Sequence, residues 1–173
     1  MNLSAAAGLL PRAAALRSVY YRMIDARHMA EIDEIAHAVL YSWRYNPKGE
    51  FGVLYLSSSP ECCWREKLKQ VHGQAADLPP QAVGCFDASI SKCLDLTDEN
   101  CRKALAVSPE DLVRPTDFTA TQDLARHARR AGFEAILAPS AIGADCRTLV
   151  VFKDKLSAPS YCALRPDSIK AYP

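Results

Sequence analysis

The sequence lacks an excess of charge of either sign. Its 173 residues include 21 Lys and Arg against 20 Asp and Glu, which gives a formal net charge of +1. A chain this close to neutral has no broad electrostatic field to attract DNA, RNA or an anionic membrane surface. We therefore expect no direct binding to nucleic acid or membrane. Hydrophobic residues make up 49% of the chain, well above the range of disordered proteins.

Long hydrophobic runs are also missing. No stretch approaches the roughly 20 apolar residues that a membrane-spanning helix requires. The alanine-rich N-terminus has the look of a signal peptide, but no basic residue precedes its apolar run, and Pro11, Arg12 and Arg17 interrupt it. These features predict a cytoplasmic protein.

Paired cysteines at metal-binding spacing do not occur, although the chain has seven cysteines. No C-x-x-C pair is present, and no closely spaced histidine pair follows to complete a zinc site. Cys62 and Cys63 are adjacent, so they cannot easily bridge each other. We expect reduced, mostly buried thiols and no metal.

The common catalytic motifs are absent as well. The sequence contains no G-x-G-x-x-G, G-x-x-x-x-G-K-[ST], G-x-S-x-G or H-E-x-x-H pattern. Its histidines are scattered beside charged residues, which favours solvated or capping roles over catalysis. Arg126, Arg129 and Arg130 form a basic helix face, for which solvation near a helix C-terminus is the favoured interpretation.

The order of strand-like and helix-like segments favours an α+β fold, because it shows no regular βαβ alternation. We predict one domain over residues 1–173, with a core at about 19–153 and an N-terminal arm at 1–18. The expected strands are 19–24, 51–57, 83–96, 135–138 and 148–152. The expected helices are 31–40, 60–72, 97–105 and 121–130.

Four short islands stand out within this framework: Tyr21-Arg22, Trp43-Arg44-Tyr45-Asn46, Tyr55 to Glu66, and Pro139-Ser140. An arginine in the first strand, an Arg-aromatic-Asn turn ending in Gly49, a tyrosine in the next strand, a helix with a small residue three before glutamate, and a late Pro-Ser follow one another. This order resembles the RES-domain family, which comprises NAD-consuming toxins of bacterial toxin–antitoxin pairs. The resemblance spans roughly residues 19–153.

The resemblance implies an ADP-ribosyltransferase-like fold, a split mixed β-sheet with flanking helices. It also implies cleavage of NAD+ at the nicotinamide–ribose bond, with no metal. The ADP-ribose is then either transferred to a protein acceptor or released by hydrolysis or phosphorolysis, and the residues leave these outcomes open. The implied partner is a cognate antitoxin with a helix-turn-helix DNA-binding part.

Carried onto this sequence, the family pattern makes Glu66, Arg44 and Ser140 the candidate catalytic residues. A carboxylate such as Glu66 stabilises the oxocarbenium character that develops when the nicotinamide–ribose bond breaks. The candidate NAD-binding residues are Arg22, Arg44, Tyr55 and Asn46. Guanidinium groups match pyrophosphate oxygens, Tyr55 offers a ring face or a hydroxyl, and Ser140 can bond nicotinamide, phosphate or Glu66. Tyr45 and Arg147 are secondary candidates.

Ordinary structural interpretations stand beside these roles. Glu66 can be an exposed helix glutamate paired with Lys69 or Gln70, and Tyr55 can be a packing residue. Tyr41-Ser42-Trp43 replaces glycines common in the family, and the helical spacing over residues 29–40 suggests an altered wall of the site. The alternative function is a non-catalytic module that binds a nucleotide or a partner. An RNA-cleaving toxin is disfavoured, because no basic–aromatic stripe is present.

Overall fold

A computed structural model describes residues 1–173. Its strands are β1 Ala14–Asp25, β2 Leu54–Ser57, β3 Gln81–Asp95, β4 Ala135–Ser140, β5 Gly143–Val151, β6 Tyr161–Leu164 and β7 Lys170–Tyr172. Its α-helices are α1 Ala6–Leu9, α2 Ala36–Val39, α3 Pro60–Gln70, α4 Glu99–Leu105, α5 Pro109–Val113 and α6 Thr119–Ala131. Short 3-10 helices are η1 Leu3–Ala5, η2 Leu10–Arg12, η3 Ala26–Glu31, η4 Ala75–Asp77 and η5 Lys153–Lys155. No helix is long and apolar enough to cross a membrane.

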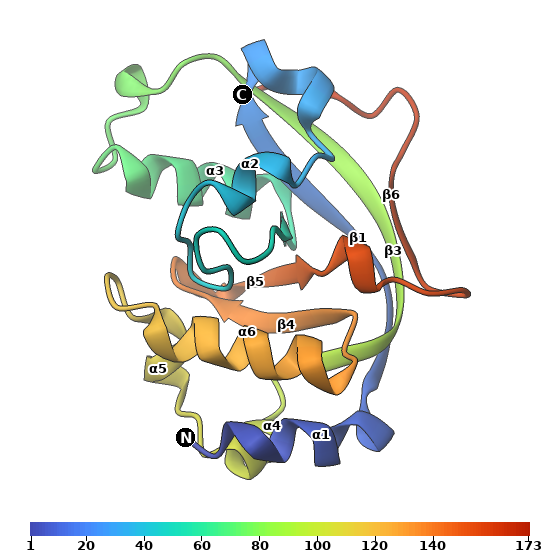
Figure 1. The fold of residues 1–173 in the computed structure, drawn as a ribbon. Coiled ribbons are helices and arrows are strands. Elements are labelled where there is room, and N and C mark those ends of the chain that lie inside the picture. Colours follow the sequence, from blue (N-terminus) through green and yellow to red (C-terminus); the bar gives the residue numbers. More distant parts are fainter.

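The seven strands form one mixed sheet that divides into two parts (Figure 1). The long strands β1 and β3 pair antiparallel along nearly their whole length, and β6 and β7 add to β3. The second part has the order β2-β5-β4 and is antiparallel throughout. Only the single pair Tyr21↔Ser57 joins β1 to β2, while β4 joins the end of β3 in parallel. The α+β class and the mixed sheet with flanking helices are confirmed.

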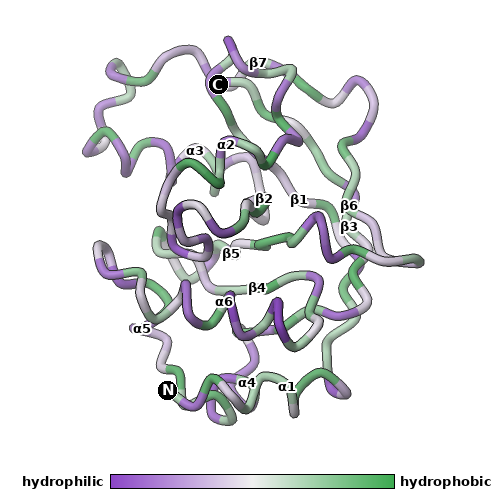
Figure 2. Tube along the Cα trace, viewed as in Figure 1, coloured by the Kyte–Doolittle hydropathy of each residue, from purple (hydrophilic) through white to green (hydrophobic).

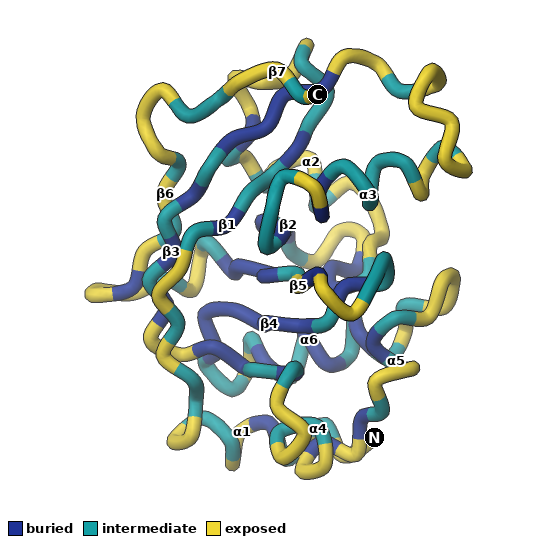
Figure 3. The backbone as a smooth tube through the Cα atoms, turned by 180° about the vertical axis from the view of Figure 1, so that it is seen from behind, coloured by how far each residue is buried: buried dark blue, intermediate teal, exposed yellow.

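Helices cover one face of the β4–β5 part of the sheet. This face packs against α6 together with α4, α5 and the N-terminal helices, in a core that contains Leu124, Phe133 and Phe152. Hydropathy alternates along α6, which buries Thr121, Leu124, Ala125 and Ala128 against the sheet (Figure 2). Strand β4 and the last three residues of β5, Leu149 to Val151, are almost continuously buried (Figure 3). They form a rigid base for the residues at their ends.

Helix α3 begins, and helix α6 ends, at the capping residue that the sequence predicts. The Ser59 side chain accepts a hydrogen bond from the Cys62 N–H at 3.0 Å, and Pro60 occupies the first helical position of α3. Helix α6 ends at Gly132, which has a φ of 97°. That left-handed conformation favours glycine at the end of a helix.

Three segments differ from the sequence prediction. Strand β1 begins at Ala14 rather than residue 19, and the preceding helices pack on α6 with Ala6 fully buried, so an N-terminal arm separate from the core is wrong. The predicted helix at 31–40 is only η3 and the single turn α2, because residues 32–35 leave the helical path between them. Strands β6 and β7 lie beyond residue 153 and were missed.

The prediction that all cysteines are reduced is also wrong. Cys62 at the start of α3 is bonded to Cys146 on β5, across a sequence separation of 84 residues. The other five cysteines are free thiols. Sequence spacing could not indicate this pair, because the two residues come together only when α3 packs on the sheet.

This bond should contribute to stability because it closes a long loop in the unfolded chain. We expect reduction to lower the free energy of unfolding by about 2–5 kcal/mol, measured by urea denaturation with and without dithiothreitol. The double variant Cys62→Ser/Cys146→Ser should be insensitive to the reductant. Equal unfolding midpoints for the oxidised and reduced wild-type protein would contradict this expectation.

Candidate active site

A cavity of about 430 Å³ lies where the two parts of the sheet separate. Its walls come from β1, the 43–45 turn, β2, α3, the segment before α6, and the ends of β4 and β5. Of the predicted site residues, the structure brings six together in its lining, namely Arg22, Arg44, Tyr55, Glu66, Ser140 and the secondary candidate Tyr45, whereas the secondary candidate Arg147 lies outside it. Asn46 is not among them.

Glu66 is held between two strands of the sheet. Its Oε1 accepts a hydrogen bond from the Ser140 Oγ at 2.8 Å, and its Oε2 accepts a longer one from the Ser57 Oγ at 3.4 Å. Of the three partners predicted for Ser140, the structure shows Glu66. The register of β4 against β5 shifts between Pro139 and Ser140, and such irregularities re-aim side chains. The interpretation of Glu66 as an exposed residue paired with Lys69 or Gln70 does not hold.

Helix α3, which carries Glu66, is fixed to the hairpin between β4 and β5 by side-chain contacts in addition to the disulfide. The Arg65 guanidinium donates to Asp145 Oδ2 at 2.7 Å and to the Ile142 carbonyl at 2.8 Å. The Lys69 Nζ donates to the Ala141 carbonyl at 3.2 Å. These contacts set the orientation of α3, so the Glu66 carboxylate is positioned by the frame as well as by its own partners.

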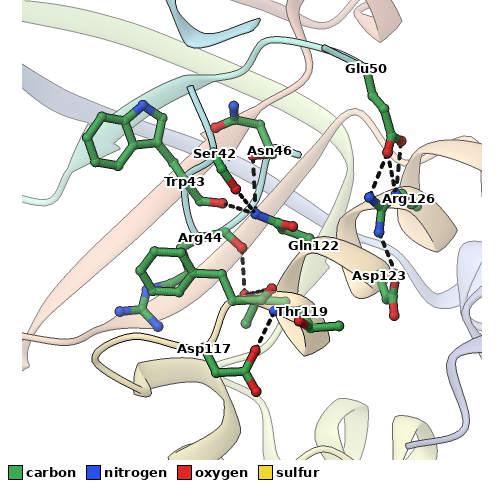
Figure 4. A network of polar contacts seen from close by, with 12 residues as sticks. Ser42, Trp43, Arg44, Asn46, Glu50, Asp117, Thr119, Gln122, Asp123 and Arg126 are labelled. Atoms are coloured by element: carbon green, nitrogen blue, oxygen red, sulfur yellow. Dashed lines mark hydrogen bonds and ion pairs between the residues drawn. The ribbon is translucent and has the colours of Figure 1, made fainter. Parts of the chain in front are cut away.

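The turn that carries Arg44 rests on the first turns of α6 (Figure 4). The Gln122 Nε2 donates to the Ser42 Oγ and to the Trp43 carbonyl, each at 2.8 Å. The Thr121 Oγ1 donates to the Arg44 carbonyl at 2.5 Å. Tertiary contacts thus hold the backbone of this turn, which carries none of the glycines common in the family.

Arg22 and Arg44 are each anchored through a single guanidinium nitrogen, Nη1. The Arg44 Nη1 donates to the Leu112 and Arg114 carbonyls, and its guanidinium lies 4.9 Å from the centre of the Phe118 ring. The Arg22 Nη1 donates to the Ile32 and Glu34 carbonyls at 3.0 and 2.9 Å. Burial lowers the pKa of both guanidinium groups. Their Nε and Nη2 donors have no partner in the protein and remain free for a ligand.

Asn46 and the Tyr55 hydroxyl form hydrogen bonds within the protein and are not available to a ligand in the cavity. Asn46 is 0% exposed, and its amide donates to the Ala38 and Tyr41 carbonyls. The Tyr55 hydroxyl accepts from the Tyr45 N–H at 2.8 Å and donates to the Asn46 Oδ1 at 3.0 Å. The prediction that Asn46 binds NAD is therefore wrong, because every polar atom of its amide is used inside the protein. Only the ring of Tyr55 is left for a ligand.

Sequence reasoning missed several residues of the lining. Ser57 follows Tyr55 by two positions on one strand, so strand alternation already placed both on the same face. Lys67 is the helical neighbour of Glu66, whereas Phe118 carried no sequence signal because tertiary packing alone brings it to Arg44. Cys63 also lines the cavity, and burial raises its pKa to about 12, which keeps it a thiol rather than a nucleophilic thiolate.

A sequence model of the RES domain matches residues 12–167. The chain belongs to the RES domain family. This match extends past both bounds of the predicted core and includes all of β1 and β6. Among curated proteins, the RES domain is similar to "Probable NAD(+) phosphorylase Rv3189" of Mycobacterium tuberculosis, with 34% identity over 154 residues that cover 88% of this chain and 72% of the relative.

A solved structure shares the fold of this RES domain. It is the toxin–antitoxin complex MbcT–MbcA of M. tuberculosis, one chain of which superposes with a TM-score of 0.75 at 20% identity. The superposition covers 99% of this chain and 92% of that chain. At this level of identity the likeness establishes the fold.

Tyr45 and Tyr55 provide a matched test of the hydrogen bonds that hold the turn carrying Arg44. Tyr55→Phe should lower the free energy of unfolding by about 1–3 kcal/mol, because it leaves the buried Tyr45 N–H and the Asn46 Oδ1 without partners. The Tyr45 hydroxyl is buried without any hydrogen-bond partner, so Tyr45→Phe should be neutral or stabilising. Urea denaturation of the two variants measures this difference. A cost for Tyr45→Phe equal to that for Tyr55→Phe would contradict the assignment.

Proposed function

We propose that this RES domain cleaves NAD+ at the nicotinamide–ribose bond and acts as the toxin of a toxin–antitoxin pair. The observation that carries the proposal is the Glu66 carboxylate, held by serines from two strands inside a cavity that also exposes free guanidinium donors. One carboxylate among cations suits a substrate that develops positive charge at one carbon while it carries phosphates nearby.

Glu66 is the proposed catalytic residue. Loss of nicotinamide leaves oxocarbenium character on the ribose, and a fixed carboxylate stabilises that cation without reorganising during the reaction. Ser140 is proposed as a positioning residue, because its hydroxyl donates to the Glu66 Oε1. Ser57 has the same relation to the other carboxylate oxygen, through a longer contact. The hydrogen bonds thus limit rotation of the carboxylate.

Arg44 is proposed to bind the pyrophosphate of NAD+ through its Nε and Nη2. Its Nη1 is already fixed on two carbonyls, so little side-chain entropy is lost when the free edge takes up phosphate oxygens. Arg22, which the family resemblance assigns to NAD+ binding, has the same free Nε and Nη2 donors for a phosphate group. The rings of Tyr55 and Phe118 offer flat surfaces to the nicotinamide or the adenine.

Inorganic phosphate is the proposed acceptor of the ADP-ribose. The relative that is 34% identical over most of this chain is described as a probable NAD+ phosphorylase, which favours phosphorolysis over transfer to a protein or to water. The four cationic side chains of the cavity lining, Arg22, Arg44, Lys67 and Lys69, are compatible with binding a second anion besides NAD+.

An antitoxin is the proposed partner. The structure that shares this fold is that of a toxin–antitoxin complex, which supports a partner protein of this class. The helix-turn-helix part of that partner remains a prediction from the family resemblance. Co-expression with the product of an adjacent reading frame should suppress toxicity and yield a complex on gel filtration.

Replacing the carboxylate tests the proposed activity. Glu66→Gln should lower the rate of nicotinamide release from NAD+ by about 10²–10³-fold, because it removes the fixed negative charge but keeps a similar shape. Chromatography of reactions with phosphate should show nicotinamide and phosphorylated ADP-ribose in equal amounts. The same substitution should abolish growth arrest in cells that express the protein.

Glu61→Gln is the matched control, because Glu61 is an exposed glutamate in the first turn of the same helix and lies outside the cavity. It should retain wild-type activity. A Glu66→Gln variant that still arrests growth, with NAD+ intact in the wild-type reaction, would support the alternative of a non-catalytic binding module. Radiolabel retained on a protein would instead indicate ADP-ribose transfer.

A further inference from the structure

Lys67 is a half-buried lysine without a partner in the protein. It lines the cavity directly after Glu66 on α3, and its ammonium makes no hydrogen bond and no ion pair. Its helical neighbours are different, because Arg65 pairs with Asp145 and Lys69 donates to the Ala141 carbonyl. A partly desolvated ammonium with three unused donors is costly unless an anion is bound.

Arg22 on β1 lines the same cavity and is the cation that acts on Lys67. Burial lowers the pKa of Lys67 and repulsion by Arg22 adds to this effect, while Asp25 and Glu66 act in the opposite direction. Arg22 is fixed through its Nη1 on the η3 side of the cavity and has free donors at Nε and Nη2. Both side chains line the cavity and have unused donors, and two such cations suit the binding of one compact anion.

Arg44 lies on a different wall of the cavity from Arg22. It is anchored on the carbonyls at the end of α5, whereas Arg22 is anchored just after η3, and Figure 1 shows these segments on opposite sides of α3 and β2. Glu66 is close enough to influence the pKa of both Arg44 and Lys67. The cavity therefore has two cationic ends with the carboxylate between them.

The net positive charge of the cavity lining is larger than NAD+ alone would balance. Four cationic side chains and one carboxylate line the cavity, an excess of three positive charges. NAD+ carries a doubly charged pyrophosphate and one pyridinium, so it neutralises a single charge of this excess. A hydrogen phosphate dianion would balance the remainder, whereas water or a neutral protein hydroxyl would not.

We propose that Lys67 and Arg22 form the binding site for the phosphate that accepts the ADP-ribose, on the opposite side of Glu66 from the pyrophosphate held by Arg44. This proposal rests on the proposed function and assigns its second substrate to specific residues. Lys67 supplies a compact charge, and Arg22 supplies a directional pair of donors.

The reaction then balances without any further reactant. The bond between the ribose C1 and the nicotinamide nitrogen breaks, and its electron pair cancels the charge of the pyridinium ring. A lone pair of a phosphate oxygen forms the new C1–O bond. The remaining proton of hydrogen phosphate passes to water, and nothing is oxidised or reduced.

Steady-state kinetics of nicotinamide release test the assignment. Lys67→Ala should raise the KM for inorganic phosphate by about tenfold or more, because a charge-assisted contact is lost. The KM for NAD+ should stay within about twofold of the wild-type value. Lys67→Arg should recover most of the phosphate affinity. Lys103→Ala carries the same net charge as Lys67→Ala, and it should match the wild type because Lys103 pairs with Glu99 on the surface.

Two kinetic outcomes would overturn the proposal. An unchanged KM for phosphate in Lys67→Ala would show that Lys67 does not bind it. A raised KM for NAD+ at unchanged phosphate affinity would assign the pair to the pyrophosphate instead. Far-UV circular dichroism confirms that each variant is folded before these constants are compared.

Thermal unfolding separates this proposal from the proposed function if no turnover is observed. Sodium phosphate, compared with sodium chloride at equal ionic strength, should raise the Tm of the wild type but not that of Lys67→Ala. Such a shift without nicotinamide release would sustain the phosphate site and refute NAD+ cleavage. Without either turnover or a phosphate-specific shift, the phosphate site is refuted. Nicotinamide release that is independent of phosphate would refute the acceptor site alone.

Discussion

The cavity depends on one constraint, the single pairing between β1 and β2. Strand β1 is paired along its length with β3 and meets β2 only at Tyr21 and Ser57. Beyond that pair the backbones diverge, so Arg22 on one strand and Ser57 on the other border the same opening. Helix α3 packs over this place and carries Glu66 into it. A fully paired sheet would leave no room for a ligand there.

The charged groups of the cavity are set in advance by backbone carbonyls and serines. Arg22 and Arg44 each donate hydrogen bonds from one nitrogen to two carbonyls, and Glu66 accepts hydrogen bonds from two serine hydroxyls. In each case the anchoring groups are neutral, so the full charge of the side chain is left to act on a ligand. Pairing with an opposite charge, as for Arg65 and Asp145, would have neutralised it. The same neutral anchoring occurs outside the cavity at Arg102, whose Nη1 donates to the Leu96 and Thr97 carbonyls, so it is the cavity that gives Arg22 and Arg44 access to a ligand.

Much of the fold could be predicted because its signals are local. The cap at Ser59 and the proline at position 60 indicated the start of α3, and the glycine at 132 indicated the end of α6. The disulfide, the two C-terminal strands and Phe118 could not be predicted, because each depends on residues that only tertiary packing brings together. The helical spacing at 31–40 misled because its apolar residues do not share one buried face: Ile32 is buried, whereas Ala36 and Leu40 are exposed.

The Arg44-Tyr45-Asn46 turn shows that a sequence motif can locate a site without showing which of its residues face the cavity. Arg44 faces the cavity, but Tyr45 and Asn46 are buried beneath it and hold the turn to Tyr55 and α2. A turn that must present one charged side chain in a fixed orientation needs partners for its own buried amides, and here the Tyr55 hydroxyl supplies them. Lys67 is the converse case. It belongs to none of the matched motif positions, yet it lines the cavity with all its donors free, so only the structure could indicate it as a candidate ligand-binding residue.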